Sequence, residues 1–422
     1  MRSLPPKTTF FQIATSTIFW LSALAAPRSK SDVLIYGEPE SVGMESKPLL
    51  EMKSNFTAYT HPGNYSSFTH YQTHPIQPGG AVMVAREGTI VHSFAFGKRN
   101  IYANVSGAHL PSHLQEDATL DTVYDMASVT KVFTSVAALR EMDAGRIRLN
   151  DTVAKHVPGF EVNGKEDITI RMLVSHTSGF DADPNPPLYS SSYTTYEQRI
   201  EAIITQGLKN TPGSTYLYSD LNFMSLMLVL ENVTGRKLDD LIRDFTQPMG
   251  MHSTFFNRNN LEGRHNPFWV RSAAQEFQIG PIDPLRPQPV RGTVHDENAW
   301  ALGMILNNGT YGGHRILSHE AVDLIYTNLN ARFSNIDSSH GVGFELNQFY
   351  TDGPLNTTLV ASHTGYTGTS LAIDRGRNLF YIQFANRVHP SRLWSSNNLL
   401  REALGYWVGT SLGLKLPFPL KK

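Results

Sequence analysis

Patterns that are typical of β-strands lie near both ends of this chain, and a long stretch with helical patterns separates them. Near the N-terminus, an apolar run at 81–85, a turn at Glu87-Gly88 and a second run at 89–96 predict a β-hairpin. Short apolar segments bounded by Gly, Asp and Asn follow much later, at 342–346, 359–363, 370–374 and 379–386. Because such strands bury their apolar faces by sharing a sheet, we expect one mostly antiparallel sheet built from both ends of the chain.

Helical patterns fill the middle of the chain and also flank the strands. An apolar face recurs along 48–59, where Leu49, Leu50, Met52 and Phe56 are expected to point inward, and again along 396–408. Other helices are predicted at 128–145, 196–206, 220–234, 238–247, 297–306 and 318–328. The Pro- and Arg-rich segment 266–290 is expected to run over the surface. These patterns predict an α+β fold, an α/β sandwich with an inserted all-helical domain.

One large domain is expected to account for most of the 422 residues, a length that easily buries a core. It is predicted to span 46–409, with an α/β part at 46–125 and 335–409 and a mainly helical part at 126–334. An N-terminal extension at 26–45 and a C-terminal tail at 410–422 are expected to lie outside this domain.

The first 25 residues have the pattern of a secretory signal peptide. Arg2 and Lys7 precede a mostly apolar run at 10–24, and Ala23-Leu24-Ala25 provides a small-x-small cleavage site; an uncleaved anchor is the alternative. Sequons for N-glycosylation occur at Asn55, Asn64, Asn104, Asn150, Asn232, Asn308 and Asn356. Together these features predict a eukaryotic secreted glycoprotein with no membrane segment after removal of the signal.

Composition excludes several classes of function. Lys and Arg total 36 against 37 for Asp and Glu, so no basic excess points to nucleic acid. The chain has no cysteine, which excludes thiol catalysis and cysteine-ligated zinc. The acidic pair Asp296-Glu297 lies beside His295, but no His-Glu-x-x-His motif occurs, so neither a metal nor another cofactor is predicted.

The only Ser-x-x-Lys of the sequence, Ser128-Val129-Thr130-Lys131, begins the helix predicted at 128–145. Three residues apart on a helix, the serine and the lysine lie on one face. They also lie in the first turn, where free N–H groups and the helix dipole favour negative charge. This arrangement can generate a serine alkoxide, although a solvated N-cap serine followed by a surface lysine is the simpler alternative.

Two further fragments add groups with acid, base or hydrogen-bonding chemistry. Tyr218 precedes Ser219-Asp220 at the start of a predicted helix and can act as an acid/base phenol; a buried tyrosine with Asp220 as N-cap is the alternative. The segment 361–368 lies between two predicted strands, and its glycines allow its backbone to approach a ligand closely. A plain hairpin loop is the alternative for this segment.

Taken in order, these fragments resemble the motifs of the serine β-lactamase and penicillin-binding-protein superfamily. The most similar pattern is that of the class C branch: Ser-x-x-Lys, Tyr-x-Asn and Lys/His-Thr-Gly. The stretches 173–179 and 292–299 resemble two other hallmarks of this branch. It includes class C β-lactamases, family VIII carboxylesterases, D-aminopeptidases and fungal acyltransferases. The resemblance covers roughly 46–409 and implies the fold expected from the patterns.

The resemblance implies that Ser128 is the nucleophile and that Lys131 and Tyr218 exchange its proton. A serine hydroxyl is a poor nucleophile until a neighbouring group removes that proton. A lysine must be desolvated or flanked by charge before its pKa approaches the working pH. Which of the two groups is the formal base stays open.

The same resemblance implies where a substrate binds. The backbone N–H groups of Ser128 and Tyr366 would bind the oxyanion, and removal of one such donor typically costs about 10²–10³ in rate. The residues implied in oxyanion and substrate binding are Tyr366, His363, Thr364, Gly365 and Asp220. The histidines of the two additional hallmarks, His176 and His295, are expected to hold loops and cap helices.

Two positions depart from the pattern of the branch. His363 stands where many members have lysine, and a histidine is mostly uncharged near neutral pH. Asp220 stands where asparagine binds an amide carbonyl, to which a carboxylate cannot donate; it can instead keep Lys131 charged. Both departures favour ester or acyl-transfer chemistry over β-lactam hydrolysis.

The sequence therefore predicts a secreted serine hydrolase that forms an acyl-enzyme at Ser128 from a small-molecule ester, lactone or amide. A transesterase or acyltransferase that tailors a fungal secondary metabolite is the second hypothesis. A D-aminopeptidase or β-lactamase and a catalytically inactive binding glycoprotein are the others. The acyl acceptor and the oligomeric state stay open.

Overall fold

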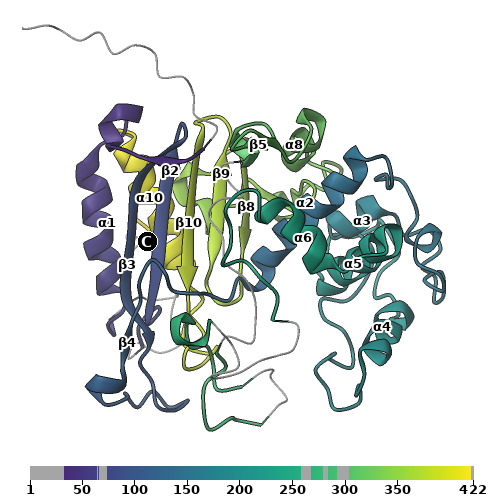
Figure 1. Cartoon of the computed structure of the whole chain (residues 1–422), viewed down its shortest axis with the longest axis horizontal. Coiled ribbons are helices and arrows are strands. Elements are labelled where there is room, and N and C mark those ends of the chain that lie inside the picture. Colours follow the sequence, from purple (N-terminus) through teal and green to yellow (C-terminus); the bar gives the residue numbers. More distant parts are fainter. Residues whose placement is uncertain are drawn as a thin grey trace, which may run out of the picture.

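The computed structural model describes residues 33–63, 65, 74–257, 268–278, 284–291 and 304–419. The strands of its main sheet are β1 (Ile35–Tyr36), β2 (Gly79–Arg86), β3 (Thr89–Asn100), β4 (Glu116–Asp117), β7 (Glu345–Leu346), β8 (Val360–Thr364), β9 (Ser370–Asp374) and β10 (Leu379–Ala385). They follow the order β1-β3-β2-β10-β9-β8-β7, and β4 pairs with β3 at the side (Figure 1). A separate ribbon consists of β5 (Thr310–Tyr311) and β6 (His314–Arg315).

Both ends of the chain contribute to this sheet, as the sequence predicted. The β2–β3 hairpin forms around the Glu87-Gly88 turn, and β10 pairs with β2 in antiparallel register from Leu379–Arg86 to Ala385–Gly80. All strand pairs of the sheet are antiparallel except β1 with β3. The prediction of a strand over 342–346 was too long, because Gly343 has a φ of +69° and cannot continue an extended strand.

Two terminal helices, α1 (Ser46–Ala58) and α10 (Asn398–Ser411), pack against each other on one face of the sheet (Figure 1). Leu49, Met52 and Phe56 of α1 are buried in a core shared with α10 and the sheet. The expectation for Leu50 was wrong, since its side chain is 63% exposed. Leu50 is rotated by one residue from the buried face, and at 3.6 residues per turn this is enough to reach solvent.

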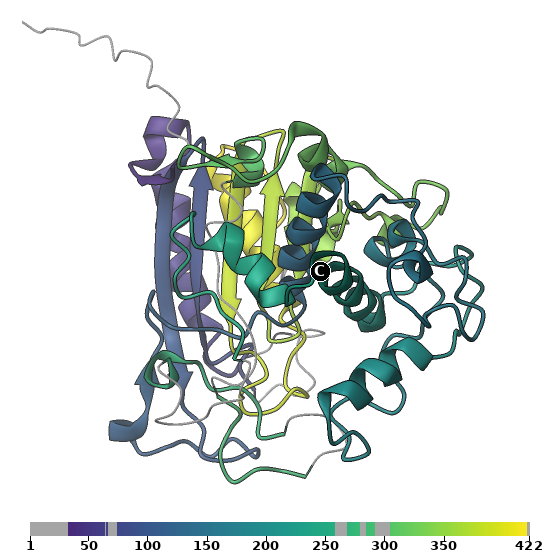
Figure 2. The same ribbon diagram turned by 45° about the vertical axis from the view of Figure 1, so that its right-hand side comes forward.

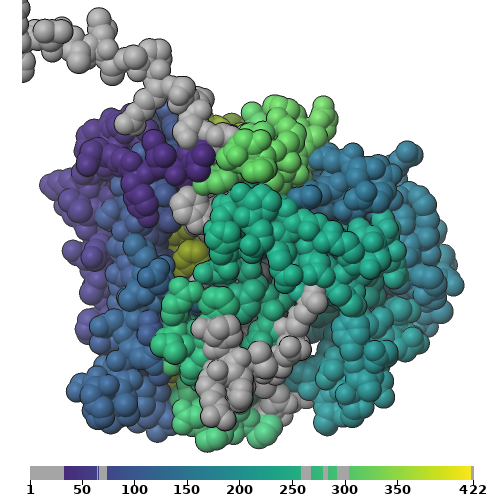
Figure 3. Space-filling view, in the orientation of Figure 1, coloured from purple at the N-terminus to yellow at the C-terminus, as the bar shows by residue number. Residues whose placement is uncertain are grey.

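The opposite face of the sheet carries the helical part of the chain (Figure 2). Its helices are α2 (Thr130–Asp143), α3 (Ile170–Val174), α4 (Tyr196–Thr205), α5 (Asp220–Thr234), α6 (Leu238–Thr246) and α8 (His319–Tyr326), while the short α9 (Phe349–Asp352) lies next to α10. In the space-filling view, α6 and the chain that follows it cover central strands on this side (Figure 3). The α+β fold with a helical insertion is thereby confirmed; the domain boundaries at 46 and 409 stay predictions.

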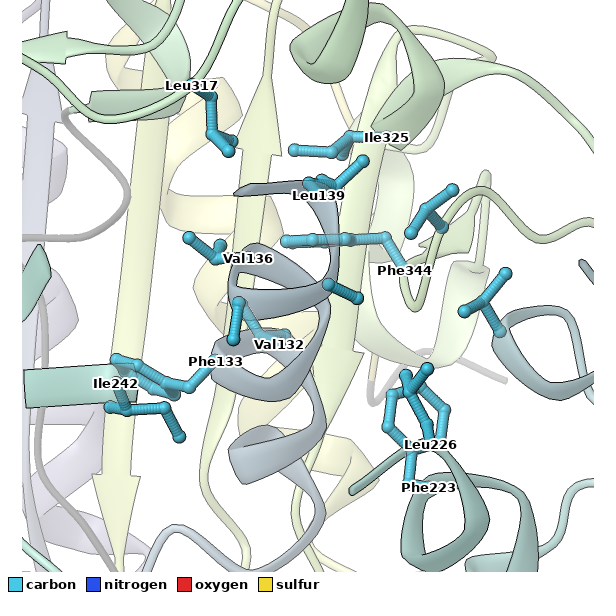
Figure 4. Packing of buried hydrophobic residues seen from close by; sticks show 14 of the residues in the cluster. Val132, Phe133, Val136, Leu139, Phe223, Leu226, Ile242, Leu317, Ile325 and Phe344 are labelled. Carbon is cyan, nitrogen blue, oxygen red and sulfur yellow. The ribbon is translucent and has the colours of Figure 1, made fainter. Parts of the chain in front are cut away.

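Helix α2 lies at the centre of the second core (Figure 4). Val132, Phe133, Val136 and Leu139 are at most 1% exposed, and they pack among apolar residues of α5, α6 and α8 and around Phe344. Truncation of a buried aromatic side chain such as that of Phe133 to alanine typically costs about 3–5 kcal/mol of stability. The helix is therefore held firmly, and its N-terminal end is a rigid support for side chains.

One expectation about the connecting segments was wrong, and another lies largely outside the described residues. The described residues 268–278, within the proposed surface segment 266–290, include the buried Ala273, Ala274 and Phe277. The N–H groups of Ala273 and Ala274 bond to the carbonyls of Val123 and Arg99, so this segment adds to the edge of the fold. The helix predicted at 297–306 falls mostly outside the described residues. Within them, no helix is long and apolar enough to cross a bilayer.

A fully buried carboxyl group, that of Glu345 in β7, leads to a prediction about stability. Burial raises its pKa to about 7 from its ordinary value of 4.5, although Tyr350, Arg401 and Lys131 act in the opposite direction. The folded state therefore binds more protons than the unfolded chain between these two pH values, and stability falls as the pH rises through them. We expect a Glu345→Gln variant to be more stable than wild type at pH 8, by on the order of 3 kcal/mol, and to be similar below pH 4.5.

Denaturant unfolding at several pH values measures this difference. The matched control is Glu51→Gln on α1, where the carboxylate is exposed and lies 3.9 Å from Lys47 Nζ. Its stability is expected to follow wild type at every pH. A Glu345→Gln variant with the same pH dependence as wild type would contradict the prediction.

Candidate active site

Ser128 lies in the 3-10 turn Ala127–Val129, which leads directly into α2. The preceding residue, Ala127, has a φ of +46°, a left-handed conformation that is costly for a residue with a Cβ atom. The Asp125 carboxylate accepts a hydrogen bond from the Ala127 N–H at 2.8 Å and supports this conformation. The Ser128 hydroxyl is thus presented from a tight turn on a rigid helix, in place of the regular first helical turn that was predicted.

The Lys131 ammonium group links Ser128 to the start of α5. Its Nζ lies 3.1 Å from Ser128 Oγ and 2.7 Å from Asp220 Oδ1, and the lysine as a whole is only 8% exposed. Asp220 is the first residue of α5, and Ser219 occupies the N-cap position. The three side chains form a continuous chain of contacts from a hydroxyl through a cation to a carboxylate, so the surface-lysine alternative is wrong.

Burial acts to lower the pKa of Lys131, but interactions with Tyr218 and Asp220 outweigh it and raise this pKa above its ordinary value. The ammonium form is therefore the resting state near neutral pH. This agrees with the expectation that Asp220 keeps Lys131 charged.

Tyr218 completes the group around Lys131. The Lys131 Nζ lies 5.0 Å from the centroid of the Tyr218 ring. Burial raises the pKa of the phenol, and Lys131 and Ser128 act in the opposite direction. The Tyr218 hydroxyl is buried, and its interactions with Lys131 and Ser128 place it in the same group as the candidate nucleophile. A buried phenol beside a serine and an ammonium group can give or take a proton when a substrate arrives.

His176 fixes the position of Tyr218 from behind. Its ring lies 4.4 Å from the Tyr218 ring, centroid to centroid, and its Nδ1 is 3.1 Å from both the Ser219 N–H and Asn222 Nδ2. Since Nδ1 accepts from the Ser219 N–H, the ring proton belongs on Nε2. Burial lowers the pKa of His176 well below its ordinary value, so the ring is neutral. This agrees with the loop-holding role expected for His176; His295 lies outside the described residues.

His363 does not reach the surface of the site, contrary to the prediction that it binds substrate. Its side chain is completely buried at the end of β8, and Nδ1 lies 2.8 Å from the Thr364 carbonyl oxygen, to which it donates. Burial and the nearby Lys131 lower its pKa to about 3, which keeps the ring neutral and leaves Nε2 without a proton. A neutral, buried ring in this tautomer has no donor to offer a substrate carbonyl.

The segment after His363 packs directly against the turn that holds Ser128. A Cβ atom on Gly365 would lie 2.6 Å from the Met126 carbonyl oxygen, so only glycine allows this approach. Thr367 Oγ1 donates to the Asp125 carbonyl at 2.6 Å, which joins the two segments again. The side chain of Tyr366, which lies between Gly365 and Thr367, is 47% exposed. The backbone N–H groups of Ser128 and Tyr366 thus belong to neighbouring segments, and their role as oxyanion donors stays a prediction.

The described residues contain no cluster of three or more His, Cys, Asp or Glu side chains that could hold a metal. Among the sequons, Asn104, Asn150 and Asn232 are exposed. Asn55, Asn308 and Asn356 are half-buried, and Asn55 Oδ1 accepts a hydrogen bond from Trp407 Nε1 at 3.2 Å. Asn64 is not among the described residues.

The chain matches the protein-family model described as beta-lactamase over residues 67–405. It therefore belongs to the β-lactamase family, within the β-lactamase/transpeptidase-like superfamily that the motifs indicated. The match includes Ser128, Lys131, Tyr218 and the segment around Gly365.

Relatives in this family carry several names. The chain is 28% identical to a protein of Escherichia coli K12 provisionally named D-alanyl-D-alanine carboxypeptidase, and the match covers 88% of this chain and 91% of that protein. The fold is similar to that of simvastatin synthase (LovD) from Aspergillus terreus, with a TM-score of 0.62, 17% identity and coverage of 87% and 99%. It is also similar to a family VIII carboxylesterase, with a TM-score of 0.62, 20% identity and coverage of 86% and 97%.

The contact between Asp220 and Lys131 leads to a prediction about pH dependence. We expect an Asp220→Asn variant to have a lower Lys131 pKa, because removal of the carboxylate removes a charge that favours the ammonium form. The limb of the pH–rate profile that belongs to Lys131 should then move to lower pH. If this limb rises with pH, the neutral amine is the active form; if it falls, the ammonium is.

The kcat/KM of both forms against pH, measured with one activated ester, checks this prediction. Asp181→Asn is the matched control, because the Asp181 carbonyl accepts a hydrogen bond from Ser219 at the N-cap of α5, whereas its carboxylate pairs with Lys209 at 2.8 Å. Its profile should overlay that of wild type. A limb that stays in place or moves to higher pH in Asp220→Asn would contradict the assignment.

Proposed function

We propose that this protein is a serine hydrolase that forms an acyl-enzyme at Ser128 from a small-molecule ester or lactone. The observation that carries the proposal is the contact chain from Ser128 Oγ to Lys131 Nζ at 3.1 Å and on to Asp220 Oδ1 at 2.7 Å. Lys131, at the centre of this chain, is 8% exposed, and the buried Tyr218 hydroxyl lies close enough for Lys131 and Ser128 to oppose the rise that burial causes in its pKa. A purely structural serine has no use for this arrangement.

The proposed chemistry begins with attack of Ser128 Oγ on the substrate carbonyl carbon. The serine O–H bond breaks as the C–O bond forms, and the proton passes into the group formed by Lys131, Tyr218 and Asp220. The negative charge moves to the carbonyl oxygen, to which the N–H groups of Ser128 and Tyr366 would donate hydrogen bonds. Collapse of this intermediate expels the alcohol, which takes a proton from the same group, and leaves an acyl ester on Ser128.

The second half repeats these steps with a new nucleophile. Water attacks the acyl carbon and gives its proton to the same group; the bond between the acyl carbon and Ser128 Oγ then breaks, the serine oxygen takes a proton from the group, and the acid is released. An alcohol that attacks in place of water would form a new ester by the same steps. Lys131 and Tyr218 both hold their protons near neutral pH, so neither is a free base at rest. One of them must pass its own proton to another member of the group as it takes the proton of the nucleophile. The pH profile of Asp220→Asn distinguishes Lys131 from Tyr218 as the base.

Two features support esters over β-lactams as substrates. Asp220 forms an ion pair with Lys131 at 2.7 Å, and a carboxylate in such a pair cannot donate to an amide carbonyl of the substrate. His363 is buried and neutral, and it supplies no positive charge for a substrate carboxylate. Among the similar proteins, the family VIII carboxylesterase and the simvastatin synthase fit this preference best.

A D-alanyl-D-alanine carboxypeptidase activity is the second candidate. It is favoured by the curated relatives from Escherichia coli and Salmonella, which carry this name and match about nine-tenths of the chain. The two candidates differ in the bond that is cleaved, because a peptidase must protonate an amine leaving group and a carboxylesterase an alcohol.

A panel of substrates separates the two candidates. Purified protein is incubated with p-nitrophenyl esters of increasing acyl length, with nitrocefin and with a peptide ending in D-Ala-D-Ala, and intact mass is recorded during turnover. Ester turnover with an acyl adduct on Ser128 is expected. Release of D-Ala without ester turnover would favour the peptidase, and absence of any adduct across the panel would overturn the proposal.

We also propose that the protein is secreted and N-glycosylated. The signal-like first 25 residues and the exposed Asn104, Asn150 and Asn232 support this proposal. Expression of the full chain in a eukaryotic host should give a product in the medium whose mass falls after glycosidase treatment. An intracellular product with an intact N-terminus would argue against secretion.

A tailoring role in fungal metabolism rests on the likeness to LovD, and acyl transfer to an added alcohol is its test.

A further inference from the structure

A tight turn after β8 carries the peptide that would face the oxyanion. The Gly368 N–H donates to the Gly365 carbonyl at 2.9 Å, so residues 365–368 form a β-turn with Tyr366 at its second position. At that position the N–H group takes no part in the bond that closes the turn. The Tyr366 N–H and the Gly365 carbonyl belong to the same peptide unit, so whatever orients the carbonyl also orients the N–H.

Arg401 of α10 binds this carbonyl from inside the protein. Its Nη2 donates to the Gly365 carbonyl oxygen at 2.8 Å, and its Nη1 donates to Asn398 Oδ1 at 3.0 Å. The bond between Gly365 and Tyr366 is trans, and in a trans peptide the C=O and N–H point in opposite directions. With the carbonyl directed at Arg401, the Tyr366 N–H must point away from α10. A cation on the carbonyl also polarises the peptide and makes its N–H a stronger donor.

Arg387, which follows β10, binds the next peptide of the turn. Its Nε and Nη2 both donate to the Tyr366 carbonyl oxygen, at 3.1 and 2.6 Å, and its guanidinium carbon lies 4.9 Å from the Tyr366 ring centroid. The backbone N–H of Arg387 also donates to the Thr367 carbonyl at 2.8 Å. Two consecutive carbonyls of the turn, those of Gly365 and Tyr366, are therefore each held by a guanidinium group.

Both guanidinium groups are buried at a considerable cost. Arg401 and Arg387 are 7% and 9% exposed, and burial lowers the pKa of each, to about 10 for Arg401. Glu345 is the acidic side chain that interacts with Arg401, and its own pKa is raised to about 7. The bonds that these two arginines make are mainly to backbone carbonyls, which neutral side chains could also satisfy. The desolvation of a positive charge beneath this turn is offset if a negative charge forms near it during the reaction.

We infer that Arg401, supported by Arg387, is a positioning residue that aims and polarises the Tyr366 N–H toward the oxyanion of the acyl-transfer reaction. This inference rests on the proposed function at Ser128. Neither arginine touches the reacting atoms; each acts through a backbone peptide.

Two substitutions of Arg401 test the inference, one that removes the positive charge and one that keeps it. Arg401→Met is expected to lower kcat for an activated ester by about 10²-fold, close to the loss of an oxyanion donor, with KM changed less than about three-fold. The variant should also lose about 10²-fold in affinity for an arylboronic acid, which forms a tetrahedral anion on Ser128, while binding of the product acid stays the same. Arg401→Lys keeps a cation and should recover at least ten-fold of the lost kcat.

The matched control is Arg375→Met, at the opposite end of β9, where the guanidinium is partly exposed and pairs with Asp323 at 2.6 Å. Melting temperatures show whether each variant is folded at the assay temperature. An Arg401→Met protein that is folded and has a kcat within two-fold of wild type would overturn the inference, as would equal losses in Arg401→Met and Arg401→Lys. Failure of the proposed function looks different, because wild type itself would then form no adduct on Ser128.

Discussion

A Ser128→Ala variant is expected to lose activity toward esters by about 10³-fold or more and to form no acyl adduct at all. Ser128 carries the only hydroxyl in the contact series Ser128–Lys131–Asp220, and its Oγ lies 3.1 Å from Lys131 Nζ. It is therefore the only group of the three that can become an ester. Because the side chain lies in a turn that Asp125 and Ala127 hold together through the backbone, its truncation should leave the fold intact. Turnover of p-nitrophenyl esters and intact mass after a fluorophosphonate probe measure the two effects.

Ser135→Ala is the matched control for this variant. Ser135 lies on the same helix and is completely buried, and its hydroxyl donates to the Lys131 carbonyl at 2.8 Å. The control therefore removes a buried hydroxyl next to Lys131 without removing the nucleophile, and we expect normal labelling by the probe. Equal labelling of Ser128→Ala and wild type would show that another residue is acylated, and the proposal for Ser128 would fail.

The fold could be predicted where the local sequence signal and the tertiary structure agree. The bounds of α5 and β9 match their predictions because sharp signals end them, such as Gly235 with a φ of +68° after α5. The prediction failed for Leu50, since an apolar residue at the edge of a helical face can turn to either side. It also failed for the segment around Ala273, whose proline- and arginine-rich flanks conceal a short, buried contact with the edge of the fold.

The candidate site could be predicted only in part, for a related reason. Ser128 and Lys131 lie three residues apart, so their contact is local and the motif contains it. The contact of Lys131 with Asp220 spans 89 positions, and family order alone indicated it. Sequence reasoning missed Arg387 and Arg401, because an arginine that binds a backbone carbonyl leaves no pattern in its own neighbourhood. It also missed Asn222, whose partner His176 lies 46 positions away in the chain. It also placed His363 at the substrate, since burial of a side chain depends on every element packed around it.

A Tyr218→Phe variant is expected to lose about 10³-fold in kcat/KM for esters, within the range of 10²–10⁴ that a positioned acid/base group contributes. The ring keeps its tilted contact with the His176 ring, at 4.4 Å between centroids, so only the hydroxyl is removed from the buried space beside Lys131 and Ser128. Without the phenol, Lys131 loses one of the interactions that raise its pKa, and the proton of Ser128 has one acceptor fewer.

The loss should be larger for poor leaving groups, which need a proton donor, than for p-nitrophenolate. Rates for alkyl and p-nitrophenyl esters of one acid measure this difference. Tyr216→Phe, two residues earlier and packed against His340 at 6.1 Å, is the matched control and should keep both rates. If Tyr218→Phe loses less than ten-fold with both esters, Lys131 alone must carry the proton, and the phenol is a packing residue.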